Sequence, residues 1–125
     1  MDYWYLAATA LSVATIGAHV VGGGPEIHQP VLKSDLAKDV KAVVSVIWHA
    51  ITAIMVLSAI WLGLASVGRG LGGMPYIAAQ FFAFTGLFML YGYLRFGSLF
   101  KFPQVYIFFS LGLLVFVGYW REIPA

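Results

Sequence analysis

The sequence predicts an all-α integral membrane protein, a four-helix up-down bundle, and three observations lead to that class. Of the 125 residues, 62% are apolar and only 10% are charged, whereas a soluble domain has about 45–50% and about 25%. The mean hydropathy is +0.91. Long charge-free stretches separate the charged residues, and each can cross about 30 Å of hydrocarbon, which needs about 20 helical residues. These properties exclude a soluble domain and a disordered chain.

Four apolar stretches are predicted to cross the membrane as helices of a single domain, 1–125. The first covers about 3–21 and is predicted to stop at Gly22-Gly23-Gly24-Pro25, a strong helix terminator. A polar linker is predicted over 22–41, in which Ser34 would cap the second span and Asp35 would lie in its first turn. The remaining spans are predicted at 42–67, 75–94 and 104–120.

The charges also predict how these helices lie in the membrane. Short turns make sequential helices antiparallel, and open strands are excluded because lipid would leave their backbone groups unsatisfied. Five of the seven Lys and Arg residues fall in the linker 22–41 and in the turn 95–103. The positive-inside rule therefore places both segments in the cytoplasm and both termini outside. An outer aromatic belt is predicted from Tyr3, Trp4 and Tyr5, with further aromatic residues.

A polar stripe runs along the second predicted span. Ser45, His49 and Thr52 recur at spacings of four and three residues, so a helix presents them on one face. Close packing and polar contacts, rather than the hydrophobic effect, hold helices together in lipid. We therefore expect this stripe to dock against the first span near His19.

The stripe has two interpretations. Its hydroxyls and imidazoles could simply join two helices by hydrogen bonds, or His19, His49, Ser45 and Thr52 could bind a cofactor. Imidazole is the commonest metal ligand, so His19, His28, His49 and Glu26 are candidate ligands for a divalent metal. A His19–His49 pair is a candidate for flanking a haem iron. The neighbouring Trp48 is expected to face lipid or another helix.

Three short motifs occur in a recognisable order. They are Ile16-Gly17-Ala18-His19, Trp48-His49-Ala50 and Phe96-Gly97-Ser98-Leu99-Phe100. With them the chain resembles a small four-helix membrane family of unknown function. The resemblance implies the same four-helix fold and draws attention to His19 and His49, but it implies no activity.

Three functions follow as hypotheses. The first is a non-enzymatic inner-membrane component, either an accessory subunit of a larger complex or a self-associating bundle, because no catalytic set of residues is recognised. The second is a ligand-binding or redox protein that uses its histidines to hold haem, quinone or a divalent metal. The third is a small oligomeric transporter or channel. The expected partners are the lipid bilayer and membrane proteins, and no basic cluster is dense enough to bind nucleic acid.

Overall fold

The computed structural model describes residues 1–122, and within this range the chain is helical apart from short turns. Four stretches are long and apolar enough to cross a membrane, by length and composition. The predicted fold class is therefore confirmed. In chain order the elements are α1 (Tyr3–Gly17), the π-helix η1 (Ala18–His28), α2 (Gln29–Lys33), α3 (Lys38–Ser66), the 3₁₀ turn η2 (Leu71–Gly73), α4 (Met74–Phe96) and α5 (Gln104–Glu122).

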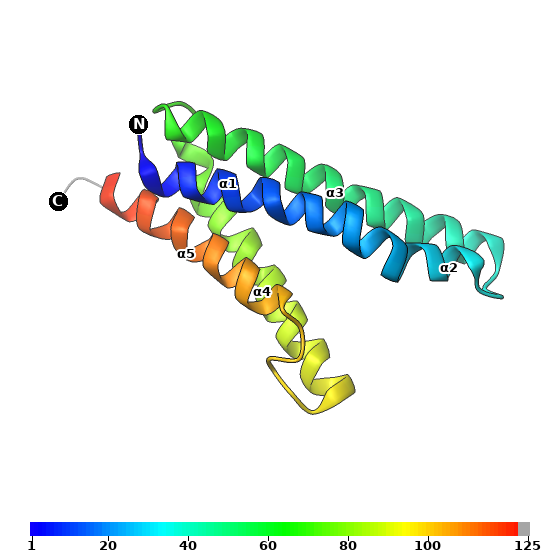
Figure 1. Ribbon diagram of the computed structural model, residues 1–125. Coiled ribbons are helices and arrows are strands. Elements are labelled where there is room, and N and C mark those ends of the chain that lie inside the picture. Colours follow the sequence, from blue (N-terminus) through cyan, green and yellow to red (C-terminus); the bar gives the residue numbers. More distant parts are fainter. Residues whose placement is uncertain (123–125) are drawn as a thin grey trace.

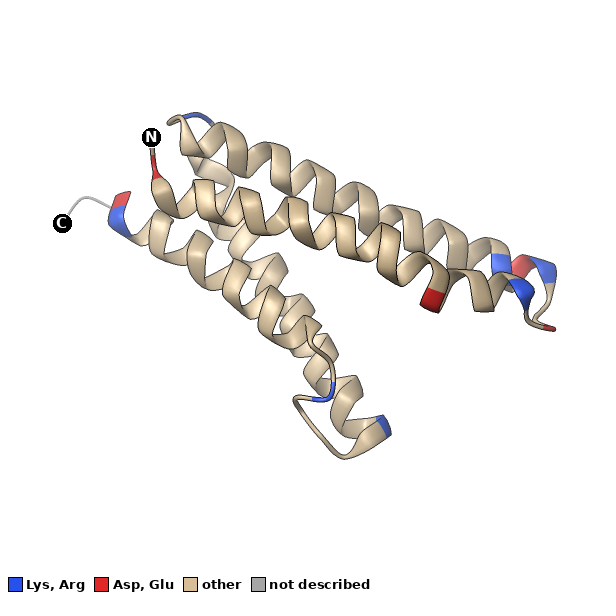
Figure 2. Ribbon diagram, viewed as in Figure 1, with Lys and Arg blue, Asp and Glu red and all other residues tan. Residues whose placement is uncertain are grey.

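The helices form two arms that diverge from a shared end (Figure 1). One arm, here the histidine arm, is the long helix α1–η1–α2 packed against α3. The other, the aromatic arm, is α4 packed against α5. Helix α1 also contacts α5 at the shared end, which is where the N-terminus and the end of α5 lie (Figure 1). Charged residues gather mainly at this end and at the two free tips (Figure 2).

The packed core lies at the shared end, where all four long helices contribute. Close helix approach depends on glycine there: a Cβ on Gly118 would lie 2.8 Å from the Tyr5 ring, and one on Gly112 would lie 2.8 Å from the Phe82 ring. Small residues of this kind let membrane helices pack closely. The buried apolar cluster consists of Tyr5, Ala8, Leu62, Ala65, Met74, Ala78, Phe81, Phe108, Leu111 and Val115.

Local signals explain most helix ends. Asp2 caps α1, because its carboxylate accepts hydrogen bonds from the backbone N–H groups of Trp4 and Tyr5 at 2.8 and 3.2 Å. Between α3 and α4 the chain turns with positive φ at Gly68 and Gly70, a conformation that glycine adopts without strain. Helices α3, α4 and α5 begin and end within a few residues of the predicted spans.

The predicted end of the first span is wrong. The backbone stays helical through Gly22-Gly23-Gly24-Pro25 as far as Lys33, so the predicted linker 22–41 shrinks to the four residues 34–37. A continuous helix pairs its backbone N–H and C=O groups within the chain, and in a membrane each such group left unpaired costs several kcal/mol. Glycine lowers helix stability by only about 1 kcal/mol per residue, and Pro25, which would cost about 3 kcal/mol in an α-helix, lies here in a π-helix. The run therefore changes the helical register instead of ending the helix.

Two smaller predictions are also corrected. Ser34 does not cap the second long helix: it ends α2, donating its hydroxyl to the Val31 carbonyl at 2.6 Å, and α3 begins at Lys38. Tyr5 is not part of an aromatic belt, because it is fully buried in the core. Its hydroxyl donates to the Glu122 carboxylate at 3.2 Å, so the tyrosine joins the first helix to the last. Residues 123–125 lie outside the described residues.

Candidate functional site

A cluster of aromatic and polar side chains joins the two helices of the histidine arm. We define this histidine–tryptophan cluster as His19, His28, Ser45, Trp48 and His49. The Trp48 ring stacks on His19 at a centroid distance of 4.0 Å and on His28 at 5.3 Å, with interplanar angles of 16° and 4°. His49 meets His28 edge to face at 5.5 Å. The indole of α3 is thus inserted between two imidazoles of the facing helix.

The π-helix is what aligns those two imidazoles. His19 and His28 are nine residues apart, which is about two and a half turns of an α-helix, so an α-helix would place them on opposite sides. The hydrogen bonds of a π-helix close one residue later, giving about 4.4 residues per turn, so nine residues make about two turns. The backbone N–H of Gln29 donates to the Gly24 carbonyl five residues earlier, as this register requires.

Glycine in the middle of the π-helix makes room for the indole. A Cβ on Gly23 would lie 2.9 Å from Cη2 of Trp48, which is too short for an ordinary contact. A Cβ added to Gly22 or to Gly24 would have nothing within 4 Å. Of the three glycines, Gly23 is therefore the one that the position of the Trp48 ring requires.

Hydrogen bonding in the cluster is sparse. Nε2 of His28 and Oγ of Ser45 lie 3.0 Å apart and join the two helices. Nε2 of His19 is buried and has no hydrogen-bond partner within residues 1–122. Thr52 donates its hydroxyl to the Trp48 carbonyl of its own helix, at 3.0 Å. The cluster therefore has one hydrogen bond between helices and one buried ring nitrogen that remains available.

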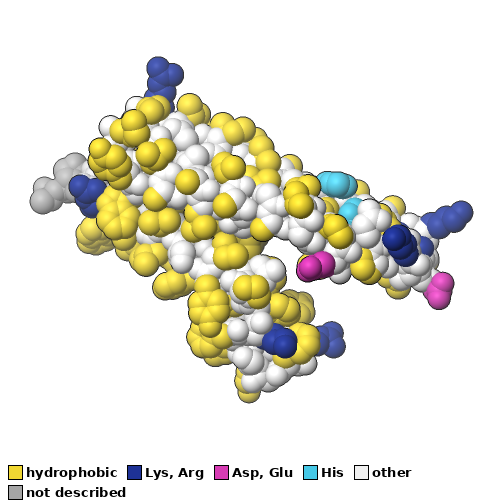
Figure 3. Space-filling view, viewed as in Figure 1, with side chains coloured by type: hydrophobic (Ala, Val, Ile, Leu, Met, Phe, Trp, Pro, Cys, Tyr) yellow, Lys and Arg dark blue, Asp and Glu magenta, His cyan; other side chains and the backbone are white. Residues whose placement is uncertain are grey.

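The structure brings together some of the predicted site residues and separates others. His19 and His28 lie against Trp48 of α3 and Ser45 lies against His28 of η1, whereas Glu26 is exposed. His49 lies at the exposed edge of the cluster, and Figure 3 shows histidine side chains at the surface of this arm. In the described part of the chain, no three His, Cys, Asp or Glu side chains are grouped so that they could hold a metal ion.

Trp48 is the central residue that sequence reasoning did not identify as part of the site. It faces another helix, which was one of the two expected positions, but there it occupies the space between two imidazoles. The signal that could have indicated its position is the run of three glycines midway between the two histidines.

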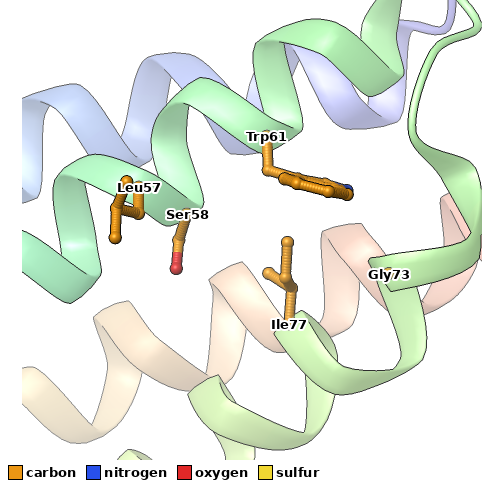
Figure 4. Close-up of a pocket in the computed structure, with 5 residues that line it drawn as sticks. All are labelled: Leu57, Ser58, Trp61, Gly73 and Ile77. Carbon is orange, nitrogen blue, oxygen red and sulfur yellow. The ribbon is translucent and has the colours of Figure 1, made fainter.

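A second feature is a groove between α3 and α4, near the shared end (Figure 4). It has a volume of about 220 Å³ and is lined by Leu57, Ser58, Trp61, Gly73 and Ile77. The Trp61 Nε1–H donates to the Gly70 carbonyl at 2.6 Å, which fixes the indole as one wall. The Gln80 amide donates to Oγ of Ser58 at 3.1 Å, linking α4 to α3.

Comparisons of the chain with family models, with curated proteins and with solved structures give no match. The function is therefore inferred from the geometry of the histidine arm.

Proposed function

We propose that this protein is a non-enzymatic multi-pass membrane subunit that associates with a second copy of itself through the exposed side of its histidine arm. In this proposal the basic tips of both arms face the cytoplasm, in accordance with the positive-inside rule. The observation that carries the proposal is the position of His49, which is exposed although it belongs to a membrane-length helix.

The depth of His49 makes its exposure costly in a monomer. It follows Lys41, the last basic residue before the apolar part of α3, by eight residues, which is about 12 Å of helix. Ionisable side chains at such depths almost always face protein or a water-filled cavity. A second protein surface over His49 would remove its contact with lipid.

The half of the histidine arm that contains His49, residues 16–54, is poorly covered by the rest of the protein. Between residues 16 and 54, all of which the structure describes, no residue is fully buried, whereas the fully buried residues of this arm lie nearer the shared end. The polar cluster therefore lies in the half of the arm that the aromatic arm does not cover. Closed two-fold dimers are the commonest oligomers, and one such contact would cover this half in both copies.

Cysteine cross-linking tests the association directly, because the natural chain contains no cysteine. Ala53→Cys lies one helical turn from His49 on an exposed part of α3 and leaves the cluster intact. Ile47→Cys is the control, because Ile47 is exposed, lies only two residues (about 3 Å) from His49 along α3, and faces the other side of the helix. We expect oxidation in native membranes to link two copies through residue 53 several-fold more than through residue 47.

The mass of the purified wild-type protein in mild detergent completes the test. A dimer with selective linkage through residue 53 supports the proposal. A monomer with no linkage at either position refutes it. A stable complex with a different protein would replace self-association by the role of accessory subunit.

A second candidate function, binding of haem, quinone or a divalent metal, is favoured by the unpartnered Nε2 of His19. A ring nitrogen that is buried without a partner is free to bind a metal or to accept a hydrogen bond. The absorption spectrum and metal content of the purified protein test this function. A Soret band, a quinone spectrum or one metal ion per chain that disappears in His19→Ala supports it, and their absence from wild type refutes it.

A further inference from the structure

The π-helical segment Ala18–His28 is the least common feature of this fold. Such helices are rare, mostly a single turn long, and frequent at functional sites. Here the segment is 11 residues long and contains Gly22, Gly23, Gly24 and Pro25. We propose that this segment switches between the π and the α register, and that the switch exchanges His28 for Glu26 beside Ser45 and His49.

The two registers differ in which side chain they present to α3. Seven residues make about two turns of an α-helix, so in the α register Glu26 would lie on the same side as His19. In the π register that position belongs to His28, nine residues after His19. Seven α residues and nine π residues also advance the chain by about the same distance, on the order of 10 Å. The carboxylate would therefore take nearly the place that the imidazole now occupies.

Proline and glycine in the segment affect the two registers differently, and the substitution Pro25→Ala removes the effect of the proline alone. In an α-helix the ring of Pro25 would clash with the carbonyl of Val21, four residues earlier, and the wider π turn relieves this clash. The three glycines lack side chains, so the backbone passes between registers with few side-chain rearrangements. Pro25 thus biases the segment toward π, and the glycines keep the α register within reach.

The tip of the arm can accommodate the exchange. Moving Glu26 into the position of His28 advances the following chain by two residues, about 3 Å of helix. The turn at 34–37 adjoins the N-terminus of α3, where Ala37 provides no side-chain cap. Uncapped first turns unwind most readily, so the start of α3 can supply the chain that the turn needs.

The exchange changes the chemistry of the contact between η1 and α3, which we call the seam. In the π register His49 faces the imidazole of His28, and Glu26 is exposed on the arm. In the α register His49 and Ser45 would face a carboxylate, and His28 would turn outward. The switch therefore presents one acidic side chain to two different environments, outside the arm and inside its seam.

Cross-linking between engineered cysteines distinguishes the registers. The pair His28→Cys/Ser45→Cys joins positions whose side chains touch in the π register, whereas Glu26→Cys/Ser45→Cys joins positions that approach only in the α register. The pair Thr9→Cys/Gly63→Cys is the control, because a Cβ on Gly63 lies 3.8 Å from Thr9, outside the switching segment. A short bifunctional thiol reagent applied in membranes should link the 28–45 pair and, more slowly, the 26–45 pair.

Pro25→Ala then shifts the balance between registers. We expect it to raise the ratio of 26–45 to 28–45 linkage at least tenfold and to leave the 9–63 linkage unchanged. Because His28→Cys removes part of the stack, a second readout keeps the cluster intact: the rate at which a lipid-soluble maleimide labels Glu26→Cys alone. That rate should fall several-fold when Pro25→Ala is added. Absence of 26–45 linkage in both backgrounds, or an unchanged labelling rate, overturns the switch.

Discussion

The contact between Gly118 and Tyr5 gives the most direct test of how the shared end is packed. Tyr5 is fully buried, and its hydroxyl is held by Glu122 at 3.2 Å, so its ring cannot swing away freely. A methyl group at residue 118 would lie 2.8 Å from Cε1 and 3.0 Å from Cζ of this ring. Gly118→Ala therefore forces α1 and α5 apart. The distance from the new methyl group to the Tyr5 ring has to grow from 2.8 Å to about 3.4 Å, where ordinary van der Waals contact begins.

Two effects of opposite sign set the magnitude of this change. Alanine is a better helix former than glycine by about 1 kcal/mol, whereas overpacking a well-packed core costs about 1–3 kcal/mol. Because the ring is buried and anchored, we expect the steric cost to dominate. With the steric cost in the upper part of its range, about 2–3 kcal/mol, less the gain of about 1 kcal/mol in helix propensity, Gly118→Ala should lose about 1–2 kcal/mol of unfolding free energy. Gly86→Ala in α4 is the control, since nothing lies within 4 Å of its added methyl group, and it should be neutral or slightly stabilising.

Reversible unfolding in mixed detergent micelles, followed by helical circular dichroism, measures both variants. The Gly118→Ala midpoint should fall below wild type, while the Gly86→Ala midpoint should equal or exceed it. In a Tyr5→Leu background, the same Gly118→Ala substitution should cost much less, because the obstructing ring is gone. Equal stability of Gly118→Ala and Gly86→Ala would refute the packing described for this end.

Three further substitutions test individual contacts. Trp61→Phe removes the bond to the Gly70 carbonyl, so it should cost about 1 kcal/mol in thermal unfolding and speed limited proteolysis at the turn after α3. Ser58→Ala leaves the Gln80 amide without its partner, and a double-mutant cycle with Gln80→Leu should give a coupling of about 0.6 kcal/mol, the average for membrane hydrogen bonds. Asp2→Ala removes the cap of α1; it should cost about 1 kcal/mol and increase hydrogen exchange of the first-turn amides, whereas Asp2→Asn should change little.

The sequence predicts the number and approximate position of the long helices because charge and lipid determine them. Each charge-free stretch is long enough to cross the membrane, and the turns at 68–73 and 97–103 each contain glycine and a basic residue. Helical structure in lipid is obligatory for an apolar segment, so this part of the prediction needs no knowledge of side-chain packing.

The register of the first helix could not be predicted in the same way. Rules for helix ends derive from chains in water, where a glycine run followed by proline releases the backbone to solvent. Around residues 22–25 the helix instead continues with wider turns. The contact between Trp48 and Gly23 that accompanies the π register joins residues far apart in the sequence, so rules for neighbouring residues do not reveal it. The sequence therefore drew attention to the three histidines of the cluster but not to the tryptophan that stacks on two of them.

The two halves of the histidine arm are held by interactions of unequal strength. At the shared end, α1 and α3 are part of the buried cluster and contact the aromatic arm. Toward the tip, the seam has one hydrogen bond between helices, from His28 to Ser45, together with the stacked rings on Trp48. A membrane hydrogen bond averages about 0.6 kcal/mol, and an aromatic pair adds about 0.5–1.5 kcal/mol. These values are small enough for the tip to rearrange while the shared end stays packed. Both the proposed association through His49 and the proposed change of register therefore involve this half of the arm.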